Sequence, residues 1–223
     1  MKKYLILIPL LIITISFSAC VAPQSQSAVA EGKDIIAPYT LSKYEARVLG
    51  AFGIDPRMEV SSGILSFHMP DKTKRIDMNL YTYEKGIIME DSPLNCSSGI
   101  IGNVDPNGLF TININNDDSI TCGISTTENN EMGSSTFTFP ANKFGEKNMT
   151  SIVDFLPAEK RIDLEKEIVV GVIKHDSRIT MEGEPFADAS NPASFAEYDY
   201  AQVIGITFSE KDITEHEDEE IVD

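Results

Sequence analysis

Histidine is the side chain that most readily exchanges protons near neutral pH, so the three histidines are the first candidates for acid–base chemistry. The run His175-Asp176-Ser177 contains the residue types of a hydrolase triad. Adjacent residues cannot converge in space as a triad requires, and the chain has no Gly-x-Ser-x-Gly elbow. His68 lies in an apolar, strand-like stretch, and His216 lies in an acidic one. We therefore assign no catalytic residue from the sequence.

Hard oxygen ligands are concentrated at two expected turns, where they could hold Ca²⁺. These residues are Asp105, Asn107, Asn113, Asn115, Asn116, Asp117 and Asp118. Asn and Asp are also common turn formers, and the chain lacks an Asp-x-Asn-x-Asp-Gly loop followed by a distant Glu. Ordinary turn chemistry is the preferred interpretation, and the sequence predicts neither a metal site nor a cofactor.

Tyr81 and Tyr83 are the residues with the best pattern for binding. In a regular strand they face away from Met78 and Leu80, on the opposite side of the sheet. Two exposed tyrosines would form a contact patch, because tyrosine supplies amphipathic contact area. The alternative is a second core layer beneath a covering segment.

Acidic residues dominate the charge of the chain. The 35 Asp and Glu residues outnumber 18 Lys and Arg, which gives a formal net charge of -17. This charge argues against nucleic acid, and against anionic lipid or wall polymer as a main partner, since such anions are bound through basic side chains. Much of the excess lies in residues 209–223, which we expect to form a disordered acidic tail. Such a tail is either simply solvated or engages a basic partner or divalent cations.

The first segment is built like a secretion signal. Lys2 and Lys3 precede an apolar run from Tyr4 to Phe17, and the run is too short to be a typical membrane span. It ends in Ser18-Ala19-Cys20, which resembles the lipobox of bacterial lipoproteins. The resemblance implies cleavage after residue 19 and attachment of lipid to Cys20. The alternative is a plain secretory signal in which Cys20 is incidental.

Cys96 and Cys122 are the cysteines that remain after Cys20. Outside the cytoplasm, two such residues are predicted to form a disulfide. The alternative is a pair of buried thiols packed as small apolar groups.

The body of the chain has the patterns of a β-rich domain. Residues 40–53 have helical periodicity, with a Ser42–Glu45 capping box and Gly53 as a stop, and we expect this helix to pack on a sheet. After Pro56 the pattern changes to alternation of apolar and polar residues, which predicts strands. The strands are predicted at residues 65–69, 76–83, 87–89, 98–101, 110–114, 120–124, 134–139, 168–173 and 200–208. Turns are predicted at residues 84–86, 105–108 and 115–119, and loops at 126–134 and 183–196.

These patterns predict one mainly β domain over residues 35–208. We expect an antiparallel β-sandwich, immunoglobulin-like or jelly-roll-like, with one short N-terminal helix. A signal peptide (1–19), the lipidated cysteine with a flexible tether (20–34) and the acidic tail (209–223) flank this domain. The alternation also resembles the β-sandwich domains of lipoproteins from low-GC Gram-positive bacteria.

The sequence predicts where the protein acts better than what it does. We expect a lipid-anchored, non-enzymatic binding or accessory module on the outer face of a bacterial cell membrane, or on an outer membrane if the cell has one. Its partner would be another envelope protein or a small ligand. The alternatives are an envelope hydrolase with an acidic or metal site, and a sensory partner of a membrane kinase or transporter.

Overall fold

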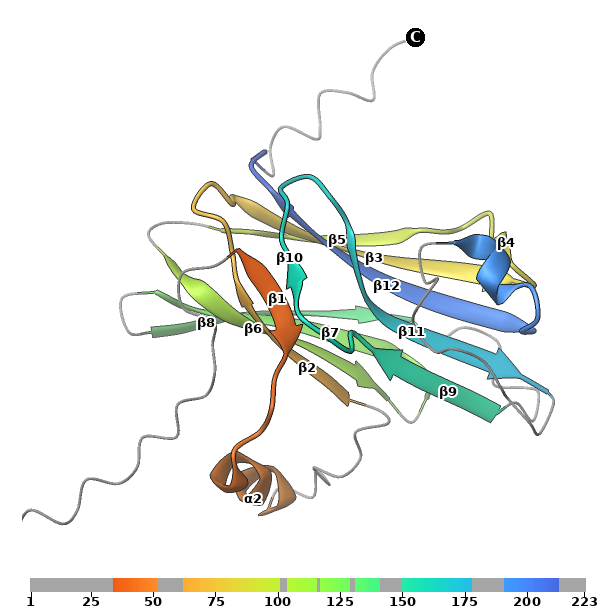
Figure 1. The fold of residues 1–223 in the computed structure, drawn as a ribbon, viewed down its shortest axis with the longest axis horizontal. Coiled ribbons are helices and arrows are strands. Elements are labelled where there is room, and N and C mark those ends of the chain that lie inside the picture. The colour runs from red at the N-terminus through yellow and green to blue at the C-terminus, as the bar shows by residue number, and fades with distance from the viewer. Residues whose placement is uncertain are drawn as a thin grey trace, which may run out of the picture.

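The chain forms two antiparallel β-sheets that pack face to face (Figure 1). The computed structural model describes residues 34–51, 62–100, 104–115, 117–128, 131–140, 150–177 and 191–212. The prediction of a mainly β antiparallel sandwich with one short N-terminal helix is confirmed. Within the described ranges, no helix has the length and apolar character needed to cross a membrane.

The first sheet has the strand order β10-β1-β2-β6-β7-β8, and all its neighbours are antiparallel. The backbone N–H of Ile162 donates to the carbonyl of Asp34, so the chain enters the sheet beside β10. The strands are β1 (Ile35–Pro38), β2 (Ser62–His68), β6 (Val104–Ile114), β7 (Ile120–Glu128), β8 (Glu131–Phe139) and β10 (Lys160–Arg161).

The second sheet has the order β4-β3-β12-β11-β9, and β5 pairs with the same edge of β3 as β4. Its two longest strands, β3 and β12, pair along their whole length, from Glu84 opposite Tyr200 to Arg75 opposite Ser209. The strands are β3 (Arg75–Glu84), β4 (Ile87–Ile88), β5 (Leu94–Gly99), β9 (Thr150–Phe155), β11 (Ile168–Asp176) and β12 (Tyr200–Ser209).

Aromatic and branched side chains fill the space between the two sheets. The Phe67 and Phe208 rings come from opposite sheets and meet edge to face, with centroids 5.4 Å apart. Each buried Phe or Ile contributes about 1.5–3 kcal/mol of transfer free energy, so this layer is the main source of stability. Its largest fully buried side chains are Phe67, Phe110, Phe139, Phe208, Ile36, Leu65, Ile76, Met78, Leu80, Ile112, Ile120 and Ile173.

A second, smaller apolar layer covers part of the outer face of the second sheet. The 3-10 helix η2 (Pro192–Phe195) and the residues after it lie over this face, near β4 (Figure 1). The Phe195 ring packs on Tyr83, with centroids 5.3 Å apart. The members of this layer are Tyr83, Val172, Phe195, Tyr198, Ala201 and Val203.

The predicted helix is present as α2 (Lys43–Ala51). Its capping box has the expected form, because the Ser42 N–H donates to Glu45 at 2.7 Å and the Glu45 N–H donates to the Ser42 hydroxyl at 3.3 Å. The expectation that its apolar face packs on a sheet is wrong for Tyr44 and Val48. Tyr44 is 76% exposed and Val48 is also exposed. Residues 52–61, including the predicted stop at Gly53, lie outside the described residues.

The predicted turns are partly confirmed. Lys85 and Gly86 form the expected hairpin turn with φ of 49° and 77°. At the predicted turn between β6 and β7, the Asn115 N–H donates to the Ser119 carbonyl and the Asp118 N–H donates to the Asn115 carbonyl, while Asn116 lies outside the described residues. The turn predicted at residues 105–108 is wrong, because β6 runs through it with a register shift between Val104 and Gly108. Pro106 lies in this irregular stretch, where the ladder needs no N–H from it. The loop predicted at residues 126–134 is also too long, since β7 and β8 extend into it.

Candidate functional site

A line of polar side chains crosses the outer face of the second sheet beside the η2 layer. Because Ile76, Met78 and Leu80 point into the core, their neighbours on β3 point outward. Side chains from β5 and from the segment before β11 join them on this face. We call this set the polar ladder, and its members are Arg75, Asp77, Asn79, Tyr81, Asn95, Ser97 and Glu167.

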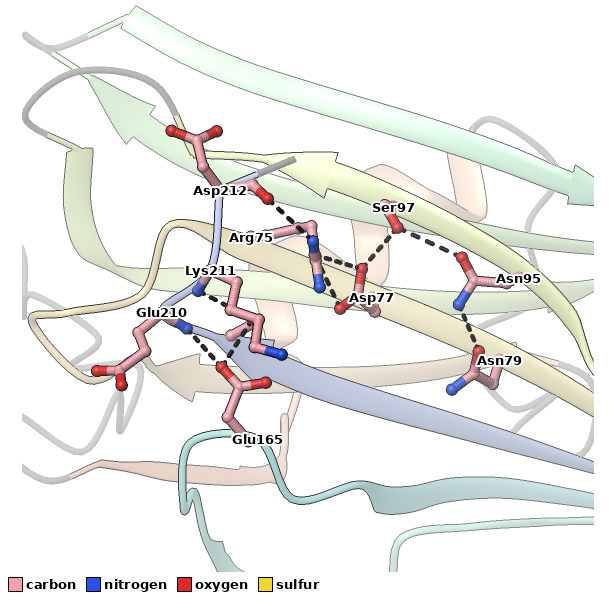
Figure 2. A network of polar contacts seen from close by, with 10 residues as sticks. Arg75, Asp77, Asn79, Asn95, Ser97, Glu165, Glu210, Lys211 and Asp212 are labelled. Atoms are coloured by element: carbon pink, nitrogen blue, oxygen red, sulfur yellow. Dashed lines mark hydrogen bonds and ion pairs between the residues drawn. The ribbon is translucent and has the colours of Figure 1, made fainter. Parts of the chain in front are cut away.

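One end of the polar ladder is a buried ion pair. Nε of Arg75 lies 2.9 Å from Oδ1 of Asp77, and the two residues are 3% and 8% exposed. Nη1 of Arg75 donates to the backbone carbonyl of Asp212 at 3.1 Å (Figure 2). The Ser97 hydroxyl donates to Asp77 at 2.6 Å. A buried charge is tolerated only when it is paired and hydrogen-bonded, and this carboxylate is both.

The middle of the polar ladder links two strands through amide groups. Nδ2 of Asn95 on β5 donates to Oδ1 of Asn79 on β3 at 2.6 Å. The Asn79 amide then donates to Oε1 of Glu167 at 2.7 Å. Oγ of Ser97 lies 3.3 Å from Oδ1 of Asn95, so the chain of contacts runs without a break from Arg75 to Glu167 (Figure 2 shows the part from Arg75 to Asn79). Such a network orients each member by its neighbours.

Glu167 completes the polar ladder because Gly205 leaves room for it. A Cβ on Gly205 of β12 would lie 2.4 Å from Oε1 of Glu167, which is far inside contact distance. The carboxylate therefore lies against the β12 backbone and accepts a second hydrogen bond, from the Tyr81 hydroxyl, at 3.0 Å. Burial, followed by the charge and hydrogen bond of Glu167, raises the pKa of Tyr81 to about 12. Tyr81 therefore stays a hydrogen-bond donor at neutral pH.

Hydrogen bonds hold the residues that follow β12 beside the Arg75 end of the polar ladder. Oε1 of Glu165 accepts from the Ser209 hydroxyl at 2.8 Å and from the Glu210 N–H at 2.9 Å (Figure 2). The Ser209 hydrogen bond is the main reason that the pKa of Glu165 lies below its usual value. The predicted acidic tail thus begins with residues that are held in place, and residues 213–223 lie outside the described residues.

An open hollow of about 580 Å³ adjoins this end of the sandwich. Three lysines and two acidic residues line it, so its charge is mixed and close to neutral. The lining residues are Asp71, Lys72, Thr73, Lys74, Ile100, Glu210 and Lys211.

The two tyrosines predicted as a contact patch have different surroundings. Tyr81 lies on the polar ladder and is half-buried. Tyr83 is only 9% exposed, beneath Phe195, so the contact-patch prediction is wrong for this residue. The second core layer that the sequence left open as an alternative describes Tyr83, because η2 covers this part of the sheet.

The predicted disulfide between Cys96 and Cys122 is absent from the structure, where both are free thiols. Cys122 is fully buried in the core and Cys96 packs against the same core. Burial raises the pKa of Cys96, and burial followed by the nearby Cys96 raises the pKa of Cys122 to about 12. The alternative of two buried apolar-like thiols therefore matches the structure. Cys20 lies outside the described residues, so its lipidation stays a prediction.

His175 makes contacts that the sequence did not indicate. The ring lies between the Ser151 hydroxyl, 2.8 Å from Nδ1, and Oε1 of Gln202, 3.3 Å from Nε2. Ser177 instead donates to Asp199 at 2.7 Å, so His175-Asp176-Ser177 does not form a triad. His68 is partly buried, with Nδ1 3.9 Å from Asp34, and His216 lies outside the described residues.

Several of the Asp and Asn residues considered as calcium ligands form hydrogen bonds with residues close to them in the sequence, and Asn116 lies outside the described residues. Asp117 accepts from the Ser119 hydroxyl at 2.6 Å, and Asp105 accepts from the Asn107 N–H at 2.9 Å. Across the described ranges, no three His, Cys, Asp or Glu side chains gather as a metal site would require.

Sequence reasoning missed most of the polar ladder. Alternation along β3 already placed Asp77 and Asn79 on the face of Tyr81, and this signal could have been used. Nothing local pointed to Glu167, whose partner Asn79 is 88 residues away in the sequence. Comparison with known proteins adds no assignment, since no protein family, no curated protein and no solved structure matches this chain.

Proposed function

We propose that this protein is a lipid-anchored binding module of the bacterial cell envelope, and that the polar ladder is its binding face. The observation that carries the proposal is the unbroken chain of hydrogen bonds from Arg75 to Glu167 and Tyr81 across an outer sheet face. Donor and acceptor groups that are already ordered lose little entropy when a ligand binds. A face of this kind is suited to directional recognition.

The charges favour a neutral or cationic polar ligand. The Arg75 guanidinium is paired with Asp77 inside the protein, so it is not offered to an anion. The exposed part of the polar ladder consists of amides, hydroxyls and the Glu167 carboxylate. The formal net charge of -17 adds repulsion against anionic ligands. Hydroxyl-rich or amide-rich groups, with or without a positive charge, are complementary to this surface.

The anchor would bring this face close to the membrane. Asp34, whose carbonyl accepts from Ile162 beside β10, is the last residue of the expected tether (residues 20–34) and the first that the structure describes. A flexible chain of about fourteen residues spans roughly 20 Å, at about 5–6 Å times the square root of its length. A partner within reach would be an envelope protein, including a membrane kinase or transporter, or a small ligand near the bilayer surface.

In-cell photocrosslinking tests the proposal. A photoreactive amino acid replaces Asn95 in one variant and Asn113 in a matched control. Asn113 is also an exposed asparagine on a strand, bonded to the Asn115 amide at 2.8 Å, but it belongs to the first sheet. We expect adducts, detected by mass spectrometry as protein or small-molecule additions, from position 95 and not from position 113. Equal adducts at both positions, or none at position 95, would contradict the proposal.

A further inference from the structure

A second polar cluster lies within the sandwich, on strands β9, β11 and β12. Ser151, His175 and Gln202 come from these three neighbouring antiparallel strands (Figure 1). Ser151 stands directly opposite His175 in the β9–β11 pairing. All three side chains are on the inner face, since Val153, Ile173 and Ile204 at alternate positions pack into the core.

With the Gln202 amide oriented as in the structure, the contacts favour one tautomer of His175. Oε1 of Gln202 is an amide oxygen and can only accept, so Nε2 of His175 carries the hydrogen that bridges their 3.3 Å. Nδ1 then holds a lone pair, and it lies 2.8 Å from the Ser151 oxygen. The Ser151 hydroxyl therefore donates to His175. This is the relation between a nucleophile, its base and the group that orients the base.

The three side chains differ in their exposure to solvent. His175 is 7% exposed and Gln202 is 3% exposed, whereas Ser151 is exposed on the edge strand β9. Burial lowers the pKa of His175, so the ring is neutral and able to accept a proton at neutral pH. Asp118, on the β6–β7 turn, is a charged group that acts on the ring, and it favours the imidazolium that proton transfer would form. The residues flanking the ring on β9 and β12 are uncharged.

We propose that Ser151 is a nucleophile activated by His175, and that it reacts with activated acyl groups such as esters. In the acylation step a bond forms between Oγ of Ser151 and the acyl carbon, and the bond to the alcohol breaks with its electron pair. The Ser151 proton passes to Nδ1 of His175 and then to the departing alcohol. This activity goes beyond the proposed binding role and departs from the non-enzymatic expectation of the sequence.

Ser177 provides a contrast within the same chain. Its hydroxyl is also exposed and donates at 2.7 Å, but to the Asp199 carboxylate. The hydrogen bond from Ser177 lowers the pKa of Asp199 below its usual value, so this carboxylate is a poor base near neutral pH. A general base near its optimal pKa contributes about 10²–10⁴-fold to a reaction rate. Ser151 should therefore react far faster than Ser177.

The test is labelling of the full-length chain, purified in mild detergent, with a fluorophosphonate probe. Phosphonylation joins Oγ of Ser151 to phosphorus, and fluoride leaves with the bonding pair while the proton passes through His175 to solvent. Peptide mass spectrometry would identify the labelled residue. The variants are Ser151→Ala, His175→Gln and the control Ser177→Ala, each checked for folding by thermal melting.

We expect stoichiometric label on Ser151, none in Ser151→Ala, and unchanged labelling in Ser177→Ala. His175→Gln should react at least about 100-fold more slowly. If His175→Gln does not fold, the wild-type pH profile replaces it, and the rate should fall on acidification with a midpoint below about 6.5. Labelling of Ser151 no faster than of Ser177, or a rate independent of pH across this range, would overturn the proposal.

Discussion

Replacing Gly205 with alanine tests whether Glu167 organises the polar ladder. The new Cβ would lie 2.4 Å from Oε1 of Glu167. Because the clash is with the far end of a flexible side chain, the carboxylate should swing away and leave the sheet undistorted. Its hydrogen bonds from Asn79 and Tyr81 would then be lost.

The expected loss of stability follows from these two contacts. At about 1 kcal/mol each, the hydrogen bonds contribute about 2 kcal/mol. Alanine also lowers the conformational entropy of the unfolded chain, which raises the free energy of unfolding by about 0.4–1 kcal/mol. The free energy of unfolding should therefore fall by about 1–1.5 kcal/mol, measured by urea denaturation, with little change in the slope against urea.

A double-mutant cycle with Glu167→Ala isolates the cause. Without the carboxylate, Gly205→Ala has nothing to displace and should be neutral or stabilising by about 0.4–1 kcal/mol. The coupling between the two positions should then be about 2 kcal/mol. In Gly205→Ala alone, the Tyr81 phenol should also ionise at lower pH than its pKa of about 12, as followed by NMR of its ring. Additive effects within about 0.5 kcal/mol, with an unchanged Tyr81 pKa, would show that Gly205 does not position Glu167.

Three further predictions concern buried groups. Arg75→Met should cost about 3 kcal/mol in urea denaturation, since it leaves Asp77 buried without its cation, and a loss below about 1 kcal/mol would contradict this. In a Cys20→Ala background, Cys122 should not react with a thiol reagent at neutral pH while the protein is folded. After unfolding, two thiols per chain should react. If no thiol reacts after unfolding, Cys96 and Cys122 form a disulfide. The pKa of His175 is lower in the folded chain than its usual value of about 6.5, so its contribution to stability is present above about pH 6.5 and is lost on acidification. When the pH is lowered from about 7 to about 5, the urea concentration at the unfolding midpoint should therefore decrease more for the wild type than for His175→Gln. Equal decreases would contradict a lowered pKa of His175 in the folded chain.

The sequence predicted the elements whose signals are local. Alternation in β3 and β12 and the capping box of α2 depend on neighbouring residues, and each is present in the structure. The turn at residues 105–108 was mispredicted because Pro and Gly mark an irregular strand as readily as a turn. The exposed side of α2 was mispredicted because helical periodicity does not show what a helix packs against.

The candidate site was mostly beyond prediction because its contacts are distant in the sequence. Tyr83 could be assigned to the core only by placing Phe195 over it. The Glu167 carboxylate required both its partner Asn79 and the space above Gly205. The Ser151–His175 contact depends on how β9 pairs with β11. The register of that pairing cannot be predicted from one amino-acid sequence.

Tyrosine footprinting on living cells tests the binding role of the polar ladder most directly. Chemical labelling of Tyr81 and Tyr44 is compared between the purified full-length protein and the protein on cells. Tyr44 is the matched control, because it is exposed on α2, away from the polar ladder. If the polar ladder binds a partner, Tyr81 labelling should fall on cells while Tyr44 labelling stays the same. Unchanged labelling of Tyr81, or protection of Tyr44 instead, would contradict that binding role.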